Sequence, residues 1–546
     1  MPDFVEDFRR QKNLVLHPFK LSHQIVEDLL KVREPINMDA IYLIAPTQNS
    51  ITAVTNDFPK RGVTKYKAAH IFFTQACPDP LFHTLSKSLN LPKIKSCKEI
   101  NIAFIPFESQ TVRTSHLEEL AIRISTVCHT LKEYPSVRYI NNNKDTTNFE
   151  LANLVLEKLK ILKDLNPSMG EGRGKLRSQL IIVDRTFDLN SIILHELTFQ
   201  AMAYDNLTME KKNFNFTDDN AQNFACFEER DILWTQIRHQ HICHAVTVVN
   251  EKLKNCVSSL HTLSLAVGAA TKSSSVWGMS NAIKMIPELN KEKEKCSLYI
   301  SELQKCMDLY GKDLVNICGL EQNLVMSDIT FGANFTDFLS ELKPYLNNVN
   351  VSTQNKMRLI ILFILHKGGL PENILNEFIQ IAQLSPTNIQ TIMNLNIILG
   401  FCATKKEGTK IQFPFGHGTR VSDEKFPVSP WTPLIKNLME NCIENKLDPE
   451  QCPFVGVNKS STENHAASSS RYTAPNAMWH KPKVSTEFQG SRVIIYILGG
   501  VTYSEMRCAY EVSKKFKNWE IIIGSSNPLT PNDFIQNLSE LNKPPH

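Results

Sequence analysis

The sequence lacks any hydrophobic run long enough to cross a membrane. Its longest apolar run, at 359–365, has seven residues, whereas a helix needs about 20 to span the hydrocarbon core of a bilayer. The N-terminus also lacks the continuous apolar stretch of a secretory signal, and the C-terminus lacks a prenylation cysteine. We therefore expect a cytoplasmic protein that has no membrane span of its own.

An excess of charge of either sign is missing too. The 60 Lys and Arg residues nearly balance the 56 Asp and Glu residues, and the formal net charge of +4 is small for 546 residues. A nucleic-acid-binding domain normally carries a strongly basic surface, so we expect no nucleic-acid partner. The 13 cysteines are scattered and include no C-x-x-C pair, which favours free thiols over a disulfide framework.

Recognisable signatures of catalysis are absent as well. There is no G-x-S-x-G nucleophile elbow, and no paired-carboxylate motif that the sequence alone can assemble. The sequence therefore has no evident reaction centre, and we expect no catalytic residue, no cofactor and no metal ion.

The pattern that is present begins with short apolar runs typical of an α/β domain. Three runs separated by helix-compatible sequence predict buried parallel strands at 40–46, 70–75 and 101–106. A second α/β unit is then predicted from a helix at 116–131, an amphipathic helix at 151–162 and a strong strand at 178–188.

The middle of the chain has a different period. From about residue 240 to 390 the apolar residues recur at helical spacing, which predicts an all-helical block. Polar and Ser-rich stretches at 403–420 and 459–476 predict exposed loops. Strands at 491–500 and 519–525 could not bury their faces alone, so we expect them to complete the sheet begun at 178–188.

This pattern predicts three domains, of which the second is split by the helical block. A length of 546 residues agrees with more than one core, because domains typically have roughly 150 residues. The predicted boundaries are 1–114 for domain 1, 115–239 and 428–546 for the two halves of domain 2, and 240–427 for helical domain 3.

Three short motifs have a chemical and a structural interpretation, and the sequence favours the structural one for each. GEGRGK (170–175) resembles a phosphate-binding loop but precedes a strand rather than following one, so a surface turn is the alternative. RHQHICH (238–244) places His239 and Cys243 four residues apart, as zinc ligands on a helix would be, or simply carries ordinary histidines. Gly499 and Gly500 predict either a ligand crevice or a tight strand-to-helix turn.

Several long strings resemble the SM (Sec/Munc) family of syntaxin-binding proteins, most closely its animal plasma-membrane branch. The strings, in the order of the family, are 68–82, 99–110, 130–139, SQLIIVDRTFD (178–188), LHELTFQAMAYDNL (194–207), WTPLIKNLMEN (431–441) and ILGGVTYSEMRCAYEVS (497–513). Over residues 1–24 the resemblance is slight, so domain 1 is expected to have an atypical N-terminal part.

The resemblance implies a three-domain arch that combines α/β and all-α domains, with mainly parallel sheets and an inserted helical domain. Domains 1 and 3 would face a syntaxin and assembled SNARE complexes, and a monomer without catalytic activity would regulate vesicle docking, fusion and exocytosis. The protein would reach the plasma membrane peripherally, through syntaxin. A truncated paralogue with impaired syntaxin binding is the alternative, and a phosphate-binding α/β enzyme is a remote one.

The resemblance also implies which side chains face syntaxin. Segment 25–35 matches the syntaxin-facing segment of domain 1, and its charged residues are Glu27, Lys31, Arg33 and Glu34. At helical spacing Glu27, Lys31 and Glu34 share one face, where they could form charge-assisted contacts with a partner. The alternative from spacing alone is a solvated face with one Glu–Lys pair.

Overall fold

The chain folds into two compact units whose segments alternate along the sequence. The computed structural model describes residues 34–100, 105–108, 111–113, 117–141, 146–171, 176–206, 231–270, 276–310, 314–330, 335–399, 431–456 and 491–541, with Leu29, Phe227 and Glu229. The first unit comprises Met1–Asp184, Cys442–Gly499 and Ser513–Asn527. The second unit comprises Arg185–Asn441, Gly500–Val512 and Pro528–His546.

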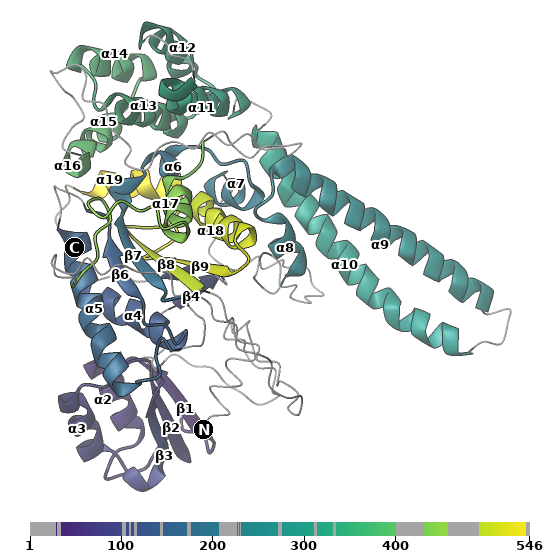
Figure 1. Ribbon diagram of the computed structural model, residues 1–546. Coiled ribbons are helices and arrows are strands. Elements are labelled where there is room, and N and C mark those ends of the chain that lie inside the picture. The colour runs from purple at the N-terminus through teal and green to yellow at the C-terminus, as the bar shows by residue number, and fades with distance from the viewer. Residues whose placement is uncertain are drawn as a thin grey trace, which may run out of the picture. The chain divides into compact units, whose positions relative to one another are not determined.

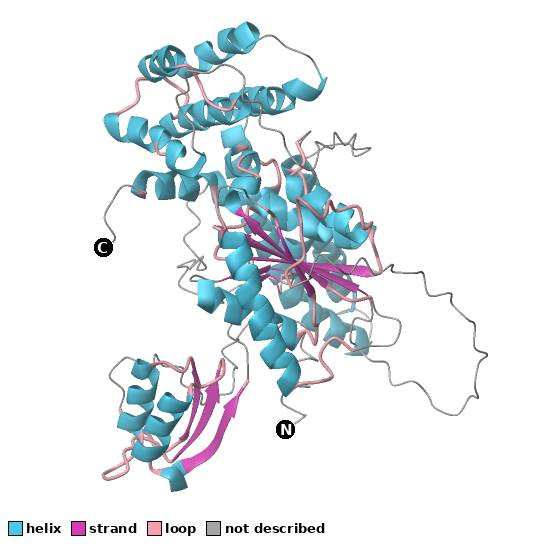
Figure 2. Cartoon of the chain, turned by 60° about the vertical axis from the view of Figure 1, so that its left-hand side comes forward, coloured by secondary structure: helices cyan, strands magenta, loops and turns pink. Residues whose placement is uncertain are grey.

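A three-stranded parallel sheet forms the N-terminal part of the first unit. Its strands are, in spatial order, β1 (Asp39–Ile44), β2 (Ala68–Phe73) and β3 (Ile94–Glu99). Helices α2 (Gln48–Asp57) and α3 (Asp79–Ser88) follow β1 and β2 and lie on one face of this sheet (Figure 2). The alternation of the strands puts Tyr42, Ile44, Ile71 and Phe73 into the core beneath those helices.

The third strand of this sheet corrects the sequence prediction. We expected it at 101–106, but β3 ends at Glu99, and residues 101–104 lie outside the described part of the chain. Ile105 and Pro106 belong instead to β4 (Ile105–Glu108), which pairs antiparallel with β5 (Thr111–Arg113). This hairpin joins the larger sheet, because β5 pairs with β9 (Trp519–Ser525). The domain boundaries given above remain predictions.

The larger sheet has six strands and is mainly parallel. Its order is β4, β5, β9, β8 (Ser491–Leu498), β7 (Gln179–Asp184) and β6 (Ser136–Tyr139). The pairing of Gln179 with Val493 and of Asp184 with Leu498 joins segments about 300 residues apart. Strands from both sides of the helical block thus complete one sheet, as predicted. Helices α4 (Leu117–Thr130) and α5 (Thr147–Leu165) share a buried core with it.

The second unit is helical and has two cores. One core joins α7 (Phe199–Asn206), α8 (Ile232–Ile237), α9 (Ile242–Ala270) and α10 (Val276–Leu309). The other joins α6 (Asn190–Ile193), α11 (Val315–Thr330), α12 (Phe335–Asn347), α13 (Thr353–Lys367), α14 (Glu372–Ala382), α15 (Pro386–Met393), α16 (Leu395–Leu399) and α19 (Pro531–Glu540). Helices α17 (Leu434–Ile443) and α18 (Tyr503–Lys515) complete the described set.

Two features of the helical block follow from its sequence. The apolar run at 359–365 lies in α13, a 15-residue helix between the Ser352 cap and Gly368, and it is buried in the core. In the described residues no helix is long and apolar enough to cross a membrane. Helices α9 and α10 lie side by side along their length as a long hairpin (Figure 1). The predicted loops at 403–420 and 459–476 lie outside the described residues.

Candidate functional site

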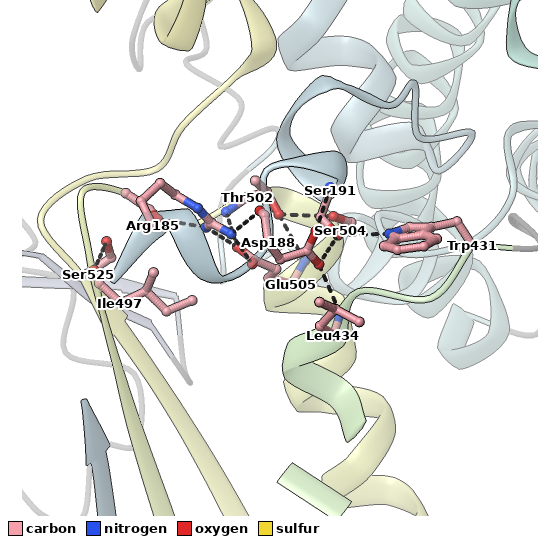
Figure 3. A network of polar contacts seen from close by, with 11 residues as sticks. Arg185, Asp188, Ser191, Trp431, Leu434, Ile497, Thr502, Ser504, Glu505 and Ser525 are labelled. Atoms are coloured by element: carbon pink, nitrogen blue, oxygen red, sulfur yellow. Dashed lines mark hydrogen bonds and ion pairs between the residues drawn. The ribbon is translucent and has the colours of Figure 1, made fainter. Parts of the chain in front are cut away.

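A buried ion pair closes the turn that follows strand β8. Arg185 directly follows β7, and Glu505 lies in the first turn of α18. Arg185 Nη1 and Nη2 donate to the two carboxylate oxygens of Glu505 at 2.8 and 2.7 Å (Figure 3). Nη1 and Nη2 also donate to the carbonyl oxygens of Gly500 and Asp188. Because this pairing is bidentate and buried, it fixes the start of α18 to the segment after β7.

The two glycines of the turn are required by backbone geometry. Gly499 and Gly500 have φ values of 94° and 116°, which side chains disfavour. A Cβ on Gly500 would also lie 2.9 Å from the Cβ of Leu529. The turn leads into a capping box, in which the Thr502 N–H donates to Glu505 Oε2 and the Glu505 N–H donates to Thr502 Oγ1. The two glycines therefore form a tight turn, and the Thr502 amide after it donates to the carboxylate of Glu505 in the same chain.

Asp188 extends this network to the segment before α17. Its carboxylate accepts hydrogen bonds from the backbone N–H and hydroxyl of Ser191 and from the N–H of Leu434, at 3.0, 2.6 and 2.9 Å. Trp431 Nε1 donates to Ser191 Oγ at 3.1 Å. Burial raises the pKa of Asp188, and the charge of Glu505 adds to this, whereas Ser191 and Arg185 oppose it. These contacts join three sequence segments, and they point to a structural role for the network.

The histidine motif at 238–244 does not have the predicted helical geometry. Helix α9 begins at Ile242, so His239 and Cys243 do not lie on one helix. The His239 ring packs against Tyr510 at 4.8 Å between centroids, and the His241 Nδ1 accepts a hydrogen bond from the Cys243 N–H. Burial lowers the pKa of His239 to about 3, and Arg238 and Arg507 contribute to this. The motif is therefore a packed turn between α8 and α9.

The described residues contain one other group with possible metal ligands. His195, Cys318 and Glu321 are buried, and their ligand atoms lie within 4.8 Å of one another. However, both carboxylate oxygens of Glu321 already accept hydrogen bonds from His195, one from Nδ1 at 2.9 Å and one from the backbone N–H at 3.0 Å. Internal hydrogen bonding accounts for this cluster without an ion.

The described part of GEGRGK also serves a turn. Gly170 has φ 81°, and a Cβ there would lie 2.6 Å from the Cβ of Tyr134. Lys163 Nζ donates to the carbonyl oxygen of Met169 at 2.7 Å and thereby holds the same turn. Residues 172–175 lie outside the described part of the chain.

The residues predicted to face syntaxin are only partly described. Glu34 is exposed, whereas Glu27, Lys31 and Arg33 lie outside the described residues. Leu29, from the same segment, is partly buried against the core beneath α2 and α3. A binding role for the four charged residues stays a prediction.

The α9–α10 hairpin offers a second candidate surface, which the sequence analysis did not single out. Val257 and Leu265 on α9 are 47% and 61% exposed, although both are apolar. With the exposed His261 they follow one another at intervals of four residues, which keeps them on one side of the helix. Exposed apolar side chains at this spacing suit packing against a helix of a partner. We call Val257, His261 and Leu265 the α9 stripe.

The base of the hairpin is firmly anchored. Asp231 caps α8 by accepting hydrogen bonds from the N–H groups of Leu233 and Trp234. Asp231 also accepts a hydrogen bond from Tyr299 and forms an ion pair with Lys295, both on α10. The ring of Tyr299 packs with Phe199, Phe227 and Trp234. The α9 stripe thus projects from a rigid aromatic base.

Comparison with known proteins extends over nearly the whole chain. The model of the Sec1 family matches residues 13–537. The protein transport protein sec1 of Dictyostelium discoideum is 28% identical, over 95% of this chain and 90% of its own length. The SNARE-interacting protein KEULE of Arabidopsis thaliana is 26% identical, over 95% of this chain and 87% of its own.

Solved structures agree with the fold. The Unc18–syntaxin 1 complex from Monosiga brevicollis matches with a TM-score of 0.76 and 27% identity, over 95% of this chain and 91% of the other. The SM protein Vps45 in complex with the Qa SNARE Tlg2 matches with a TM-score of 0.69 and 16% identity, over 93% and 87%, and supports the fold alone. The resemblance found in the sequence is confirmed, while its assignment to a plasma-membrane branch stays a prediction. The chain belongs to the Sec1 family.

Proposed function

We propose that this chain binds a syntaxin and regulates SNARE assembly during vesicle docking, fusion and exocytosis, without catalysing a reaction. The observation that carries the proposal is the similarity to an Unc18 protein solved with syntaxin 1, which covers 95% of this chain. Several other relatives are named for protein transport or SNARE interaction. Membrane association would occur through the syntaxin, at the plasma membrane.

The structure supports this proposal through the surface of the helical unit. Syntaxins and assembled SNAREs present helical bundles, and a long hairpin with apolar side chains exposed at helical spacing is suited to pack against helices. The α9 stripe would supply apolar contacts, and the charged residues Glu27, Lys31, Arg33 and Glu34 would fix the register and increase the association rate.

Binding of the purified full chain to the cytoplasmic parts of plasma-membrane syntaxins tests the proposal directly. We expect saturable binding by isothermal titration calorimetry and co-elution in size-exclusion chromatography. If folded protein, checked by circular dichroism, binds none of these syntaxins, the proposed function is wrong.

A charge reversal tests the predicted domain 1 contacts. Glu27→Lys combined with Lys31→Glu should weaken syntaxin binding tenfold or more, because a charge-assisted contact contributes about 1.5–3 kcal/mol. The matched control is Glu444→Lys with Lys446→Glu, which reverses an exposed ion pair and should leave affinity unchanged. If both double variants bind syntaxin with the affinity of the original chain, Glu27 and Lys31 do not contribute to the binding site.

A further inference from the structure

Two cysteines face each other inside the α9–α10 hairpin. Cys256 on α9 and Cys296 on α10 are 4% and 1% exposed, and the two thiols are close enough for each to affect the pKa of the other. Each lies in the buried seam of its helix, where the spacing of three and four residues marks the contact face. The seam positions are Ile242, Ala245, Val249 and Cys256 on α9, and Cys296, Tyr299, Leu303 and Cys306 on α10.

The cysteine pair lies at the outer limit of the described hairpin core. Residues 257–265 of α9 and 285–295 of α10 contain no buried side chain. Glu292, one turn before Cys296, contacts both the Cys256 thiol and Lys252, at 3.7 and 3.8 Å. In 257–265 and 285–295, the parts of the two helices beyond the cysteine pair, only exposed and partly exposed side chains are therefore available to hold the helices together.

A small reagent can reach Cys296. Cys296 lines a cavity of about 240 Å³, together with Lys252, Lys291, Glu292 and Lys295. A water molecule occupies about 30 Å³ of liquid, so the cavity has room for hydrogen peroxide and its hydration shell. Lys252 and Lys295 partly oppose the burial that raises the pKa of the Cys296 thiol, whereas Glu292 adds to it.

We propose that Cys256 and Cys296 are an oxidative modification site, at which hydrogen peroxide converts the two thiols into a reversible disulfide that joins α9 to α10. In the first step the Cys296 thiolate, which lines the cavity, attacks peroxide, the O–O bond breaks, and a sulfenic acid forms while hydroxide leaves and takes up a proton. Cys256 then attacks that sulfur, the S–S bond forms, and the sulfenic oxygen leaves as water. Overall, two thiols and one peroxide give one disulfide and two water molecules.

The electrostatic surroundings set the rate of this oxidation. Burial raises the pKa of Cys256, and Glu292 adds to this, whereas Lys252 and the hydrogen bond from Cys296 oppose it. Burial raises the pKa of Cys296 to about 11. Since the thiolate is the nucleophile, oxidation should be slow at neutral pH and accelerate as the pH rises.

The disulfide would hold the outer part of the hairpin in one register. Its formation does not depend on the proposed syntaxin binding, because it needs only the two facing thiols and an oxidant. Hydrogen exchange in 257–265 and 285–295 should become slower when the pair is oxidised and return to its original rate after reduction.

The experiment treats the purified full chain with hydrogen peroxide, alkylates the remaining thiols and maps disulfides by peptide mass spectrometry. We expect a Cys256–Cys296 cross-linked peptide, loss of both cysteines from the alkylated pool, and recovery of both with dithiothreitol. The cross-linked peptide should be absent in both Cys256→Ser and Cys296→Ser. Cys306→Ser is the matched control, because Cys306 lies in the same seam and its pKa is set by burial, Glu302 and Lys305 rather than by another thiol, and it should form the cross-link as the original chain does.

Two results would overturn the inference. One is an alkylated pool that still contains Cys256 and Cys296 after the other cysteines have reacted with peroxide. The other is their conversion to sulfinic acids or to disulfides with different cysteines, without the Cys256–Cys296 peptide. A folded Cys306→Ser control, checked by circular dichroism, keeps either result interpretable.

Discussion

At the scale of single residues, the pair of Arg185 and Glu505 shows how much of the second unit depends on one contact. Removing one partner of a buried ion pair leaves an uncompensated charge, which typically costs about 3–5 kcal/mol. Glu505→Gln should therefore lower the free energy of unfolding by about that amount. Arg185→Met added to Glu505→Gln should restore part of the loss, because the orphaned charge is gone.

Urea unfolding followed by tryptophan fluorescence measures this effect, and Trp431 lies within the same network. The control is Glu444→Gln, which removes half of an exposed ion pair and should cause no measurable change. A Glu505→Gln variant as stable as the original chain would show that the pair does not hold the turn.

His239 predicts a dependence of stability on pH. Burial, then Arg238 and Arg507, lower its pKa to about 3 in the folded chain, from an ordinary value of 6.5. Between these values the unfolded chain binds a proton that the folded chain does not, so this stability is complete above pH 6.5 and is lost as the pH falls. The loss is at most about 1.4 kcal/mol per pH unit.

Replacing the titrating ring while keeping its shape tests this prediction. His239→Phe preserves an aromatic contact with Tyr510, and its free energy of unfolding should fall less than that of the original chain between pH 7 and pH 4. Urea unfolding at several pH values gives both curves. Parallel curves for the two proteins would mean that His239 does not cause the acid sensitivity.

The residue contacts were the part of the structure that the sequence could not predict. Arg185 and Glu505 are 320 positions apart, and they meet because β7 and β8 are neighbours in the sheet. A local pattern, Thr502 followed by Glu505 three residues later, is typical of a capping box and could have indicated the carboxylate. No local pattern indicates the pairing of Cys256 with Cys296, which depends on the register of two helices.

At the scale of elements, prediction succeeded where a strand is buried on both faces. QLIIVD in β7 and SRVIIYIL in β8 are continuous apolar runs in the interior of the larger sheet. The prediction missed β3, because its sequence IKSCKE mixes polar and apolar residues and lies at an edge. The prediction also missed β6, which has only four residues and lies at an edge of the larger sheet.

Helix α10 contains a proline, Pro287, in its interior, and replacing this residue gives a prediction at the scale of one element. Proline has no N–H for the helical hydrogen bond and its ring crowds the preceding turn, at a cost of about 3 kcal/mol. Pro287→Ala should therefore stabilise the outer hairpin and slow hydrogen exchange in 285–295. Asn290→Ala, an exposed replacement in the same helix, should gain at most about 0.7 kcal/mol. Faster exchange in Pro287→Ala would indicate that the packing requires the proline.

At the scale of the whole molecule, the chain passes repeatedly between its two units. The crossings follow Asp184, Asn441, Gly499, Val512 and Asn527. The sequence predicted the principle of this arrangement, because strand signals at 178–188 and 491–500 flank a long helical block. The sequence could not predict that the chain also changes unit after Gly499, Val512 and Asn527, on either side of α18. These changes depend on how single turns pack, and the periodicity of a segment does not indicate that.

The proposed function makes its own prediction for the helical unit. If the α9 stripe packs against a syntaxin helix, charges placed there would have to be buried without partners on binding, which is costly. Val257→Asp with Leu265→Asp should weaken syntaxin binding at least tenfold, equivalent to about 1.4 kcal/mol. Because both side chains are largely exposed in the free protein, its thermal midpoint should change little.

A matched variant separates a specific site from a general effect of added acid. Val349 is 93% exposed and lies between α12 and α13, so Val349→Asp adds a charge to the same unit outside the stripe. Titration calorimetry with one syntaxin should give the original affinity for Val349→Asp and a weaker one for the stripe variant. Unchanged affinity in a folded stripe variant would exclude the stripe from the interface, while syntaxin binding by the original chain would still support the proposed function.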